Sequence, residues 1–164
     1  MKKLLRLQSA LLKEIDKYES LVSERDHFID WERVHIVSCA KIGYRLAQER
    51  GLDPIIAAAA CSCHDYGRII NGKQANHAEN GFIPVQEFLH NTGLFAEEEI
   101  QNIALAVKNH SKKGEIGTPL EELVKDADVI DFYEYGYDVA NKPQQDRLEK
   151  LMGHKIKGLK FSDE

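Results

Sequence analysis

The residues of this chain that can do chemistry are mostly histidines and aspartates, and two of them are adjacent, His64 and Asp65. The pair closes a run of small apolar residues, 55–63, that is typical of a buried helix, and Tyr66-Gly67-Arg68 follows at once. An imidazole suits Zn, Fe, Mn, Ni or Co, and a carboxylate adds neutralising charge. The dipeptide therefore predicts part of a divalent-metal site at the end of a buried helix.

Other histidines and aspartates are spread along the chain, as ligands from the facing helices of a bundle would be. The predicted ligand set is His35, His64, Asp65, His77, His110 and Asp128. A single histidine at a helix end, such as His110, is by itself more often a capping or surface residue, so the prediction depends on the whole set. His27, His90 and His154 have no matching context, and we assign them to the surface or to the surroundings of the ligands.

Three aspartates compete in the segment that follows Pro119. At about 100° per residue, Val124 and Asp131 share one stripe of a helix, and Asp128 lies about 40° from Val124, on the edge of that stripe. Asp126 lies roughly 160° from Val124, on the solvent side. Because burying an unpaired carboxylate is costly, Asp128 and Asp131 are the inward candidates, and Asp126 is either solvated or outside the ligand set.

The elements that must position these residues are helical. Apolar residues recur at steps of three or four, and the chain shows no strand-like alternation. We expect an all-α, single-domain bundle of about six to seven helices over residues 1–164. Its core covers about 27–135, and it has an N-terminal helix over 3–22 and a polar C-terminal tail over 141–164 with a short helix at 145–152.

Capping signals set the expected helix boundaries. Asp30 is a candidate N-cap for a helix that runs to Gly51, and Asp53-Pro54 starts the apolar helix. Gly67 and the pair Asn71-Gly72 are expected to end that helix. Further helices are expected at 78–89 and 96–110, and Thr118-Pro119-Leu120-Glu121 has the form of a capping box.

Composition limits the classes of partner and compartment. The net charge of −5 argues against binding to a nucleic acid polymer, which normally needs a basic stripe. The three cysteines, Cys39, Cys61 and Cys63, do not form a disulfide framework. No apolar run approaches the roughly 20 residues of a membrane span, and charged residues interrupt any signal-peptide core. We expect a cytoplasmic protein that binds no membrane.

His35, then His64-Asp65, then Asp128 within Ala127-Asp128-Val129-Ile130 resembles the HD-domain superfamily of metal-dependent phosphohydrolases. The resemblance covers about residues 27–135 and implies an all-α bundle with these four residues as metal ligands. Asp126 remains the alternative for the last position. His77 and His110 resemble the branch that has a second metal and acts on dinucleoside polyphosphates.

The resemblance implies hydrolysis of a phosphate mono- or diester or anhydride of a nucleotide-like substrate by a metal-activated hydroxide. The cofactor would be one or two ions of Fe, Mn, Co, Ni or Zn, with Asp65 as the catalytic bridge between two of them. Arg68 is either a surface residue or a phosphate-binding, catalytic group. Lys112 and Lys113 either add positive charge to the substrate site or are solvated.

Two other functions are compatible with the same residues. One is a non-catalytic sensor or adaptor that keeps the metal or nucleotide site. The other is an HD-type oxygenase with a di-iron centre, which would use a similar set of His and Asp ligands. The oligomeric state cannot be read from the sequence.

Overall fold

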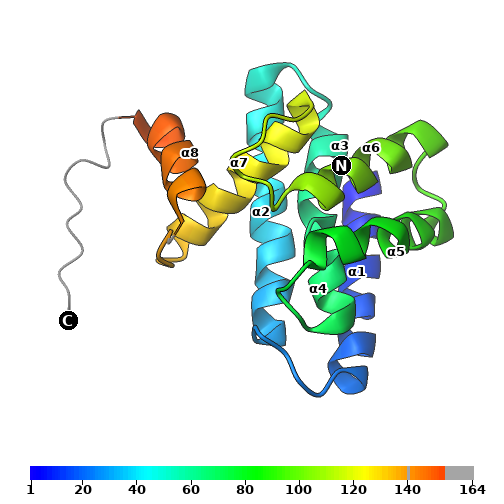
Figure 1. Cartoon of the computed structure of the whole chain (residues 1–164). Helices are drawn as coiled ribbons and strands as arrows, with labels where there is room; N and C mark the ends of the chain where they lie inside the picture. Colours follow the sequence, from blue (N-terminus) through cyan, green and yellow to red (C-terminus); the bar gives the residue numbers. More distant parts are fainter. Residues whose placement is uncertain (140, 154–164) are drawn as a thin grey trace.

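The computed structural model describes residues 1–139 and 141–153, and these residues form eight helices. Figure 1 shows them packed around the central α3, with α8 at one side of the molecule. The helices are α1 (Lys2–Leu21), α2 (Ile29–Arg50), α3 (Pro54–Cys63), α4 (Tyr66–Asn71), α5 (His77–Thr92), α6 (Glu97–Asn109), α7 (Pro119–Glu134) and α8 (Lys142–Met152). The all-α bundle predicted from the sequence is confirmed.

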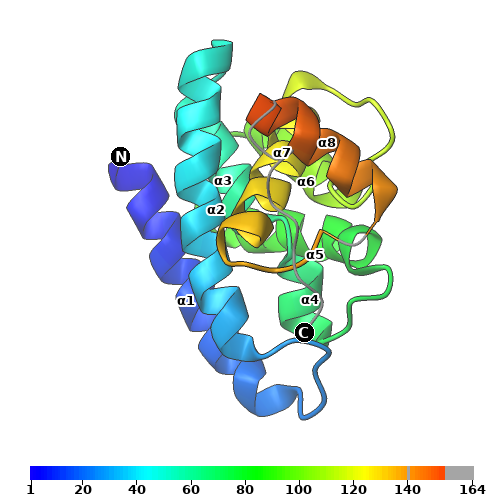
Figure 2. The same cartoon turned by 90° about the vertical axis from the view of Figure 1, so that its left-hand side faces the viewer.

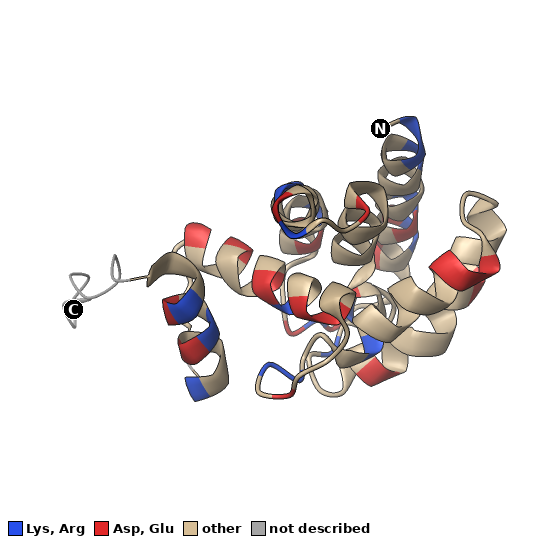
Figure 3. Ribbon diagram, turned by 90° about the horizontal axis from the view of Figure 1, so that it is seen from above, with Lys and Arg blue, Asp and Glu red and all other residues tan. Residues whose placement is uncertain are grey.

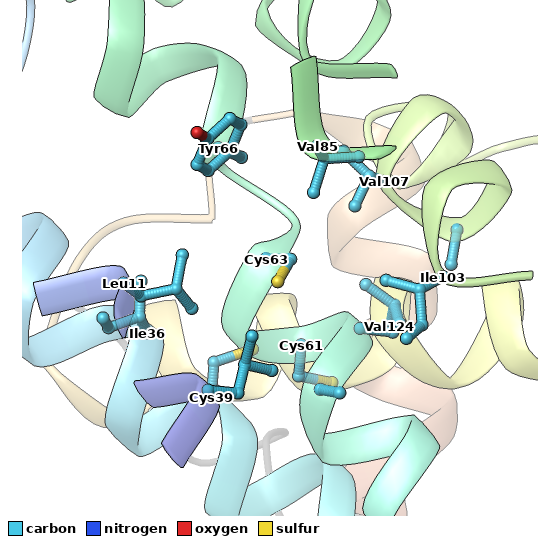
Figure 4. Packing of buried hydrophobic residues seen from close by; sticks show 14 of the residues in the cluster. Leu11, Ile36, Cys39, Cys61, Cys63, Tyr66, Val85, Ile103, Val107 and Val124 are labelled. Carbon is cyan, nitrogen blue, oxygen red and sulfur yellow. The ribbon is translucent and has the colours of Figure 1, made fainter. Parts of the chain in front are cut away.

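The core lies around α3, whose alanine run is fully buried. Short side chains there let α2, α6 and α7 approach the α3 backbone closely. Figure 4 shows this core, to which seven helices contribute, with Leu11 from α1 and Val124 from α7 on opposite sides of Cys61 and Cys63. The three cysteines are buried and free, so they serve as small apolar side chains.

The expected third helix is divided in two, at His64 and Asp65. Gly67 does not end a helix as expected but lies inside α4, where a Cβ would come within 2.0 Å of the His77 carbonyl oxygen. Gly81 of α5 packs against Gly67 from the other side. The two glycines therefore allow α4 and α5 to pack backbone to backbone, which brings His77 next to the end of α3.

Two of the three predicted N-caps are confirmed. Asp53 accepts hydrogen bonds from the backbone N–H groups of Ile55 and Ile56, and Thr118 accepts one from that of Glu121. The prediction for Asp30 is wrong, because the N-cap of α2 is Phe28, two residues earlier, and Asp30 lies in the first turn of the helix. The Asp30 carboxylate there accepts a hydrogen bond from Arg33 at 2.9 Å.

The last described helix, α8, lies against α7, as the turned view in Figure 2 shows. It includes the short helix predicted at 145–152, and its Arg147 pairs with Asp126 and Glu122 of α7. Figure 3 shows that basic and acidic residues both occur along α8. None of the helices in the described residues is long and apolar enough to cross a membrane.

Candidate metal centre

Helices α2 to α7 bring the predicted ligands to one place. His35 comes from the N-terminal third of α2, and His64 and Asp65 form the break between α3 and α4. His77 is the first residue of α5, His110 is the C-cap of α6, and Asp128 lies within α7. In two overlapping groups the ligand atoms lie within 4.8 Å of one another, close enough to hold a metal ion. The groups are His35, His64 and Asp128, and His64, Asp65 and His110.

Three of the four histidines are oriented by the same local device, a hydrogen bond to the backbone at a helix end. In each, Nδ1 lies 2.7 Å from the carbonyl oxygen of the residue three positions earlier: His64 with Cys61, His77 with Gln74 and His110 with Val107. Because a carbonyl oxygen can only accept, Nδ1 carries the proton and donates it. Nε2 of the neutral ring therefore keeps a free lone pair for a metal.

His35 is oriented by a side chain instead. Its Nδ1 lies 2.6 Å from Oδ2 of Asp131, and the hydroxyl of Ser38 donates to the same oxygen at 2.9 Å. Trp31 stacks on the imidazole with ring centroids 4.7 Å apart. Asp131, predicted to face inward, therefore lies behind His35 and fixes its ring, as carboxylates commonly do for metal-binding histidines.

The four Nε2 atoms converge in two pairs. Nε2 of His35 lies 3.0 Å from Nε2 of His64, and Nε2 of His77 lies 2.9 Å from Nε2 of His110. Two ring nitrogens this close share either a proton or a cation, and a metal ion bound between them would replace the proton. We call His35 and His64 with Asp128 the His35 group, and His77 with His110 the His77 group.

Asp65 lies between the two groups with one oxygen toward each. Its Oδ2 is 3.4 Å from Nε2 of His35 and 3.2 Å from that of His64. Its Oδ1 is 3.0 Å from Nε2 of His77 and 3.5 Å from that of His110. Oδ1 of Asp128 adds a second carboxylate to the His35 group, 3.3 Å from Nε2 of His35. The donor set of imidazole nitrogens and carboxylate oxygens fits divalent transition metals.

The buried groups of the cluster differ in charge state. Burial alone would lower the pKa of His35 and His64, but the carboxylates of Asp65 and Asp128 raise it well above the usual range, so a metal ion would displace protons from these two rings. Burial lowers the pKa of His110 to about 4, so its ring is neutral at physiological pH. Burial alone would raise the pKa of Asp65, but the Arg68 guanidinium and His64 hold it well below its usual range. Lys113 and His64 likewise outweigh burial and lower the pKa of Asp128. Both carboxylates are therefore ionised and can act as ligands.

Asp126 lies outside this cluster, in agreement with the helical-face argument for Asp128. Its carboxylate accepts from Arg147 and pairs with Arg50, each at 2.7 Å. The expectation that Asp126 is solvated is wrong, because α8 and the end of α2 cover it. Asp126 therefore pairs with two arginines, whereas Asp128, two positions later, lies beside His35 and His64.

A cavity of about 220 Å³ opens on the cluster. Arg68, one of the predicted substrate-binding residues, lines this cavity. Of the two lysines after His110, the lining includes Lys113 and not Lys112. The side-chain amine of Lys113 is paired with Asp128. The remaining wall comes from aromatic, aliphatic and amide side chains, which include Trp31, Phe132, Val139, Asn141 and Gln144.

Sequence reasoning missed several of these residues. Glu32, buried on α2 and paired with Arg68, precedes His35 by three positions, so helical spacing could have placed it on the ligand face. Asn141 and Gln144 come from the start of α8, and no sequence signal connects them to the cavity.

The remaining histidines differ in position. His27 lines the cavity, in the surroundings of the ligands. His90 is half exposed on α5 and faces Glu97. His154 lies outside the described residues.

Comparison with known proteins gives one match. The sequence matches the HD domain family over residues 33–133, well over half of the chain, and the match includes all six predicted ligands. Neither the curated proteins nor the solved structures gave a match. His35, His64, Asp65 and Asp128, which the fold gathers in one place, all lie within the matched range, and the chain belongs to the HD domain family.

Proposed function

We propose that this protein is a metal-dependent phosphohydrolase with two metal ions, which cleaves a phosphate ester or anhydride of a small, nucleotide-like substrate. The observation that carries the proposal is the position of Asp65, with Oδ2 toward His35 and His64 and Oδ1 toward His77 and His110. A carboxylate placed in this way can bridge two ions held by separate groups of histidines.

The His35 group with Oδ2 of Asp65 would hold one ion, and the His77 group with Oδ1 would hold the other. When bound, divalent ions of this kind lower the pKa of water toward neutrality and neutralise charge on phosphoryl oxygens. Iron, manganese, cobalt, nickel and zinc all suit the ligands. The hydrogen bonds of His64, His77 and His110 to backbone carbonyl oxygens keep the ligand nitrogens oriented before any ion binds.

The cavity wall supports a substrate with an organic part beyond its phosphate. Lys113 brings a positive charge to the cavity beside Asp128. Farther along the wall, the rings of Trp31 and Phe132 and the amides of Asn141 and Gln144 offer stacking surfaces and hydrogen bonds. Such a wall suits the sugar and base of a nucleotide.

The test is turnover by the metal-loaded protein. The protein is stripped of metal, reloaded with Mn²⁺, Co²⁺, Ni²⁺ or Fe²⁺, and assayed for orthophosphate release from nucleoside phosphates and dinucleoside polyphosphates, with and without oxygen. We expect metal-dependent release that needs no oxygen, and none from the His64→Ala variant. Tight ligand binding without turnover would instead indicate a sensor, and strict dependence on oxygen would indicate an oxygenase.

A further inference from the structure

The guanidinium of Arg68 is almost completely engaged by protein groups. Nε donates to Glu32 at 2.6 Å, Nη2 donates to Glu32 at 3.3 Å and to Oδ2 of Asp65, and Nη1 donates to the Gln74 side chain at 2.8 Å. An arginine has five N–H donors. These contacts leave a single N–H, on Nη1, for another partner.

A phosphate-binding arginine normally offers two parallel N–H groups to its ligand. In Arg68 the edges that could do so are taken by carboxylates. Glu32, which holds one edge, is only 1% exposed and lies on α2, one turn before His35. Glu32 lines no part of the substrate cavity, so it cannot act on a substrate directly.

We propose that Glu32 and Arg68 form a positioning pair that fixes the orientation of the Asp65 carboxylate. This proposal rests on the proposed function, in which Asp65 bridges two metal ions. It replaces the expectation that Arg68 binds the substrate phosphate.

The geometry explains why such a pair is needed. Asp65 lies at the break between α3 and α4, so its side chain is not held by neighbours on a continuous helix. A bridging carboxylate must keep one oxygen in each group of histidines, and rotation about its last side-chain bond would remove both oxygens from their places. The hydrogen bond from Arg68 to Oδ2 prevents this rotation, and Glu32 holds Arg68 in the position to make it.

Substitution of each partner tests the pair through metal binding as well as activity. Glu32→Gln and Arg68→Lys are each titrated with Mn²⁺ by calorimetry, and the Mn²⁺-saturated proteins are then titrated with inorganic phosphate. We expect each variant to bind Mn²⁺ about 10- to 100-fold more weakly than the wild type, because substitution of residues that hydrogen-bond to metal ligands commonly has an effect of this size. Phosphate affinity at saturating Mn²⁺ should be unchanged.

The double variant Glu32→Gln/Arg68→Lys should bind Mn²⁺ as Arg68→Lys does, because Glu32 acts only through Arg68. Glu49→Gln, the same change at an exposed position of α2, is the matched control and should leave Mn²⁺ binding unaltered. Circular dichroism shows whether each variant is folded. If Glu32→Gln does not fold, the Mn²⁺ affinity of Arg68→Lys alone decides the test.

Two results would overturn the proposal. One is wild-type Mn²⁺ affinity in folded Glu32→Gln or Arg68→Lys. The other is loss of phosphate binding in Arg68→Lys with metal binding intact, as expected of a phosphate clamp. A wild-type protein that binds two Mn²⁺ ions but hydrolyses no phosphate compound would refute the proposed function, while the Mn²⁺ titrations would still decide the role of the pair.

Discussion

Only one imidazole, that of His35, is held differently in the His35 group than in the His77 group, because His64 also donates to a backbone carbonyl oxygen. His35 lies inside a long helix, and its Nδ1 donates to the carboxylate of Asp131, which is on the same helix as Asp128. His77 and His110 lie at helix ends and donate to backbone carbonyl oxygens. A carboxylate partner makes an imidazole a stronger ligand than a carbonyl does, so we expect the His35 group to bind its metal more tightly.

The shared residue should give the largest effect, because it belongs to both groups. Asp65→Ala removes both ligand oxygens and should abolish binding of both metals and lower hydrolysis more than about 1,000-fold, since the activated water is lost. Metal content and orthophosphate release are measured on the same sample, and circular dichroism should show that the helices remain. Full metal content with full activity in this variant would refute the assignment of the site.

Removing one histidine of the His77 group should separate the two metals. His110→Ala is expected to lower the bound metal from two ions toward one and to leave the tighter ion in the His35 group. Equilibrium dialysis with metal analysis measures the stoichiometry. His90→Ala, at an exposed position of α5, is the control and should retain both ions. Loss of the tighter ion from His110→Ala would reverse the ranking of the two groups.

The carboxylate behind His35 should account for the stronger binding of that group. Asp131→Asn keeps the shape of the side chain but removes its charge, and should weaken the tighter metal about 10- to 100-fold. A titration of the stripped protein with Mn²⁺ measures this affinity. Glu134→Gln, an exposed change on the same helix, should have no effect. Equal affinities of Asp131→Asn and the wild type would show that the carboxylate does not distinguish the two groups.

The smallest effect on activity is expected at Asp126, which lies outside both groups. Asp126→Asn weakens the ion pairs with Arg50 and Arg147 and should lower the free energy of unfolding by about 1 to 3 kcal/mol. Hydrolysis should be nearly unchanged, in contrast to the loss in Asp128→Asn. Urea unfolding and orthophosphate release measure the two effects, and the opposite pattern would show that Asp126 is the ligand.

Much of the ligand set could be predicted from the sequence because each residue carries local information. His64-Asp65 follows an apolar run, and helical periodicity placed Asp128 rather than Asp126 on the inner side of its helix. The same periodicity failed for the surroundings of Asp126, because the arginines that cover it come from the end of α2 and from α8. A contact between two segments that are distant in the sequence leaves no periodic signal in the sequence of either segment.

The hydrogen-bond partners of Arg68 show the same limit more sharply. Its place just after Asp65 left two interpretations open, a surface residue or a phosphate-binding group. The structure buries it, so the surface interpretation is wrong, and its partners are Asp65, Gln74 and Glu32, which lies 36 residues away along the chain. Which groups occupy a guanidinium depends on how α2 and α4 pack together. Lys113 rather than Lys112 lines the cavity for the same reason, since the loop after α6 decides which of two adjacent lysines turns inward.

The sequence by itself determined the helical class, the HD pattern and the residue types that can bind a metal, because these follow from periodicity and from the chemistry of single side chains. Only the tertiary structure decided how the ligands divide between the two oxygens of Asp65 and which partner orients each imidazole. It also decided that Glu32 forms an ion pair with Arg68. These features depend on distances between helices, which arise only when the apolar faces pack around α3.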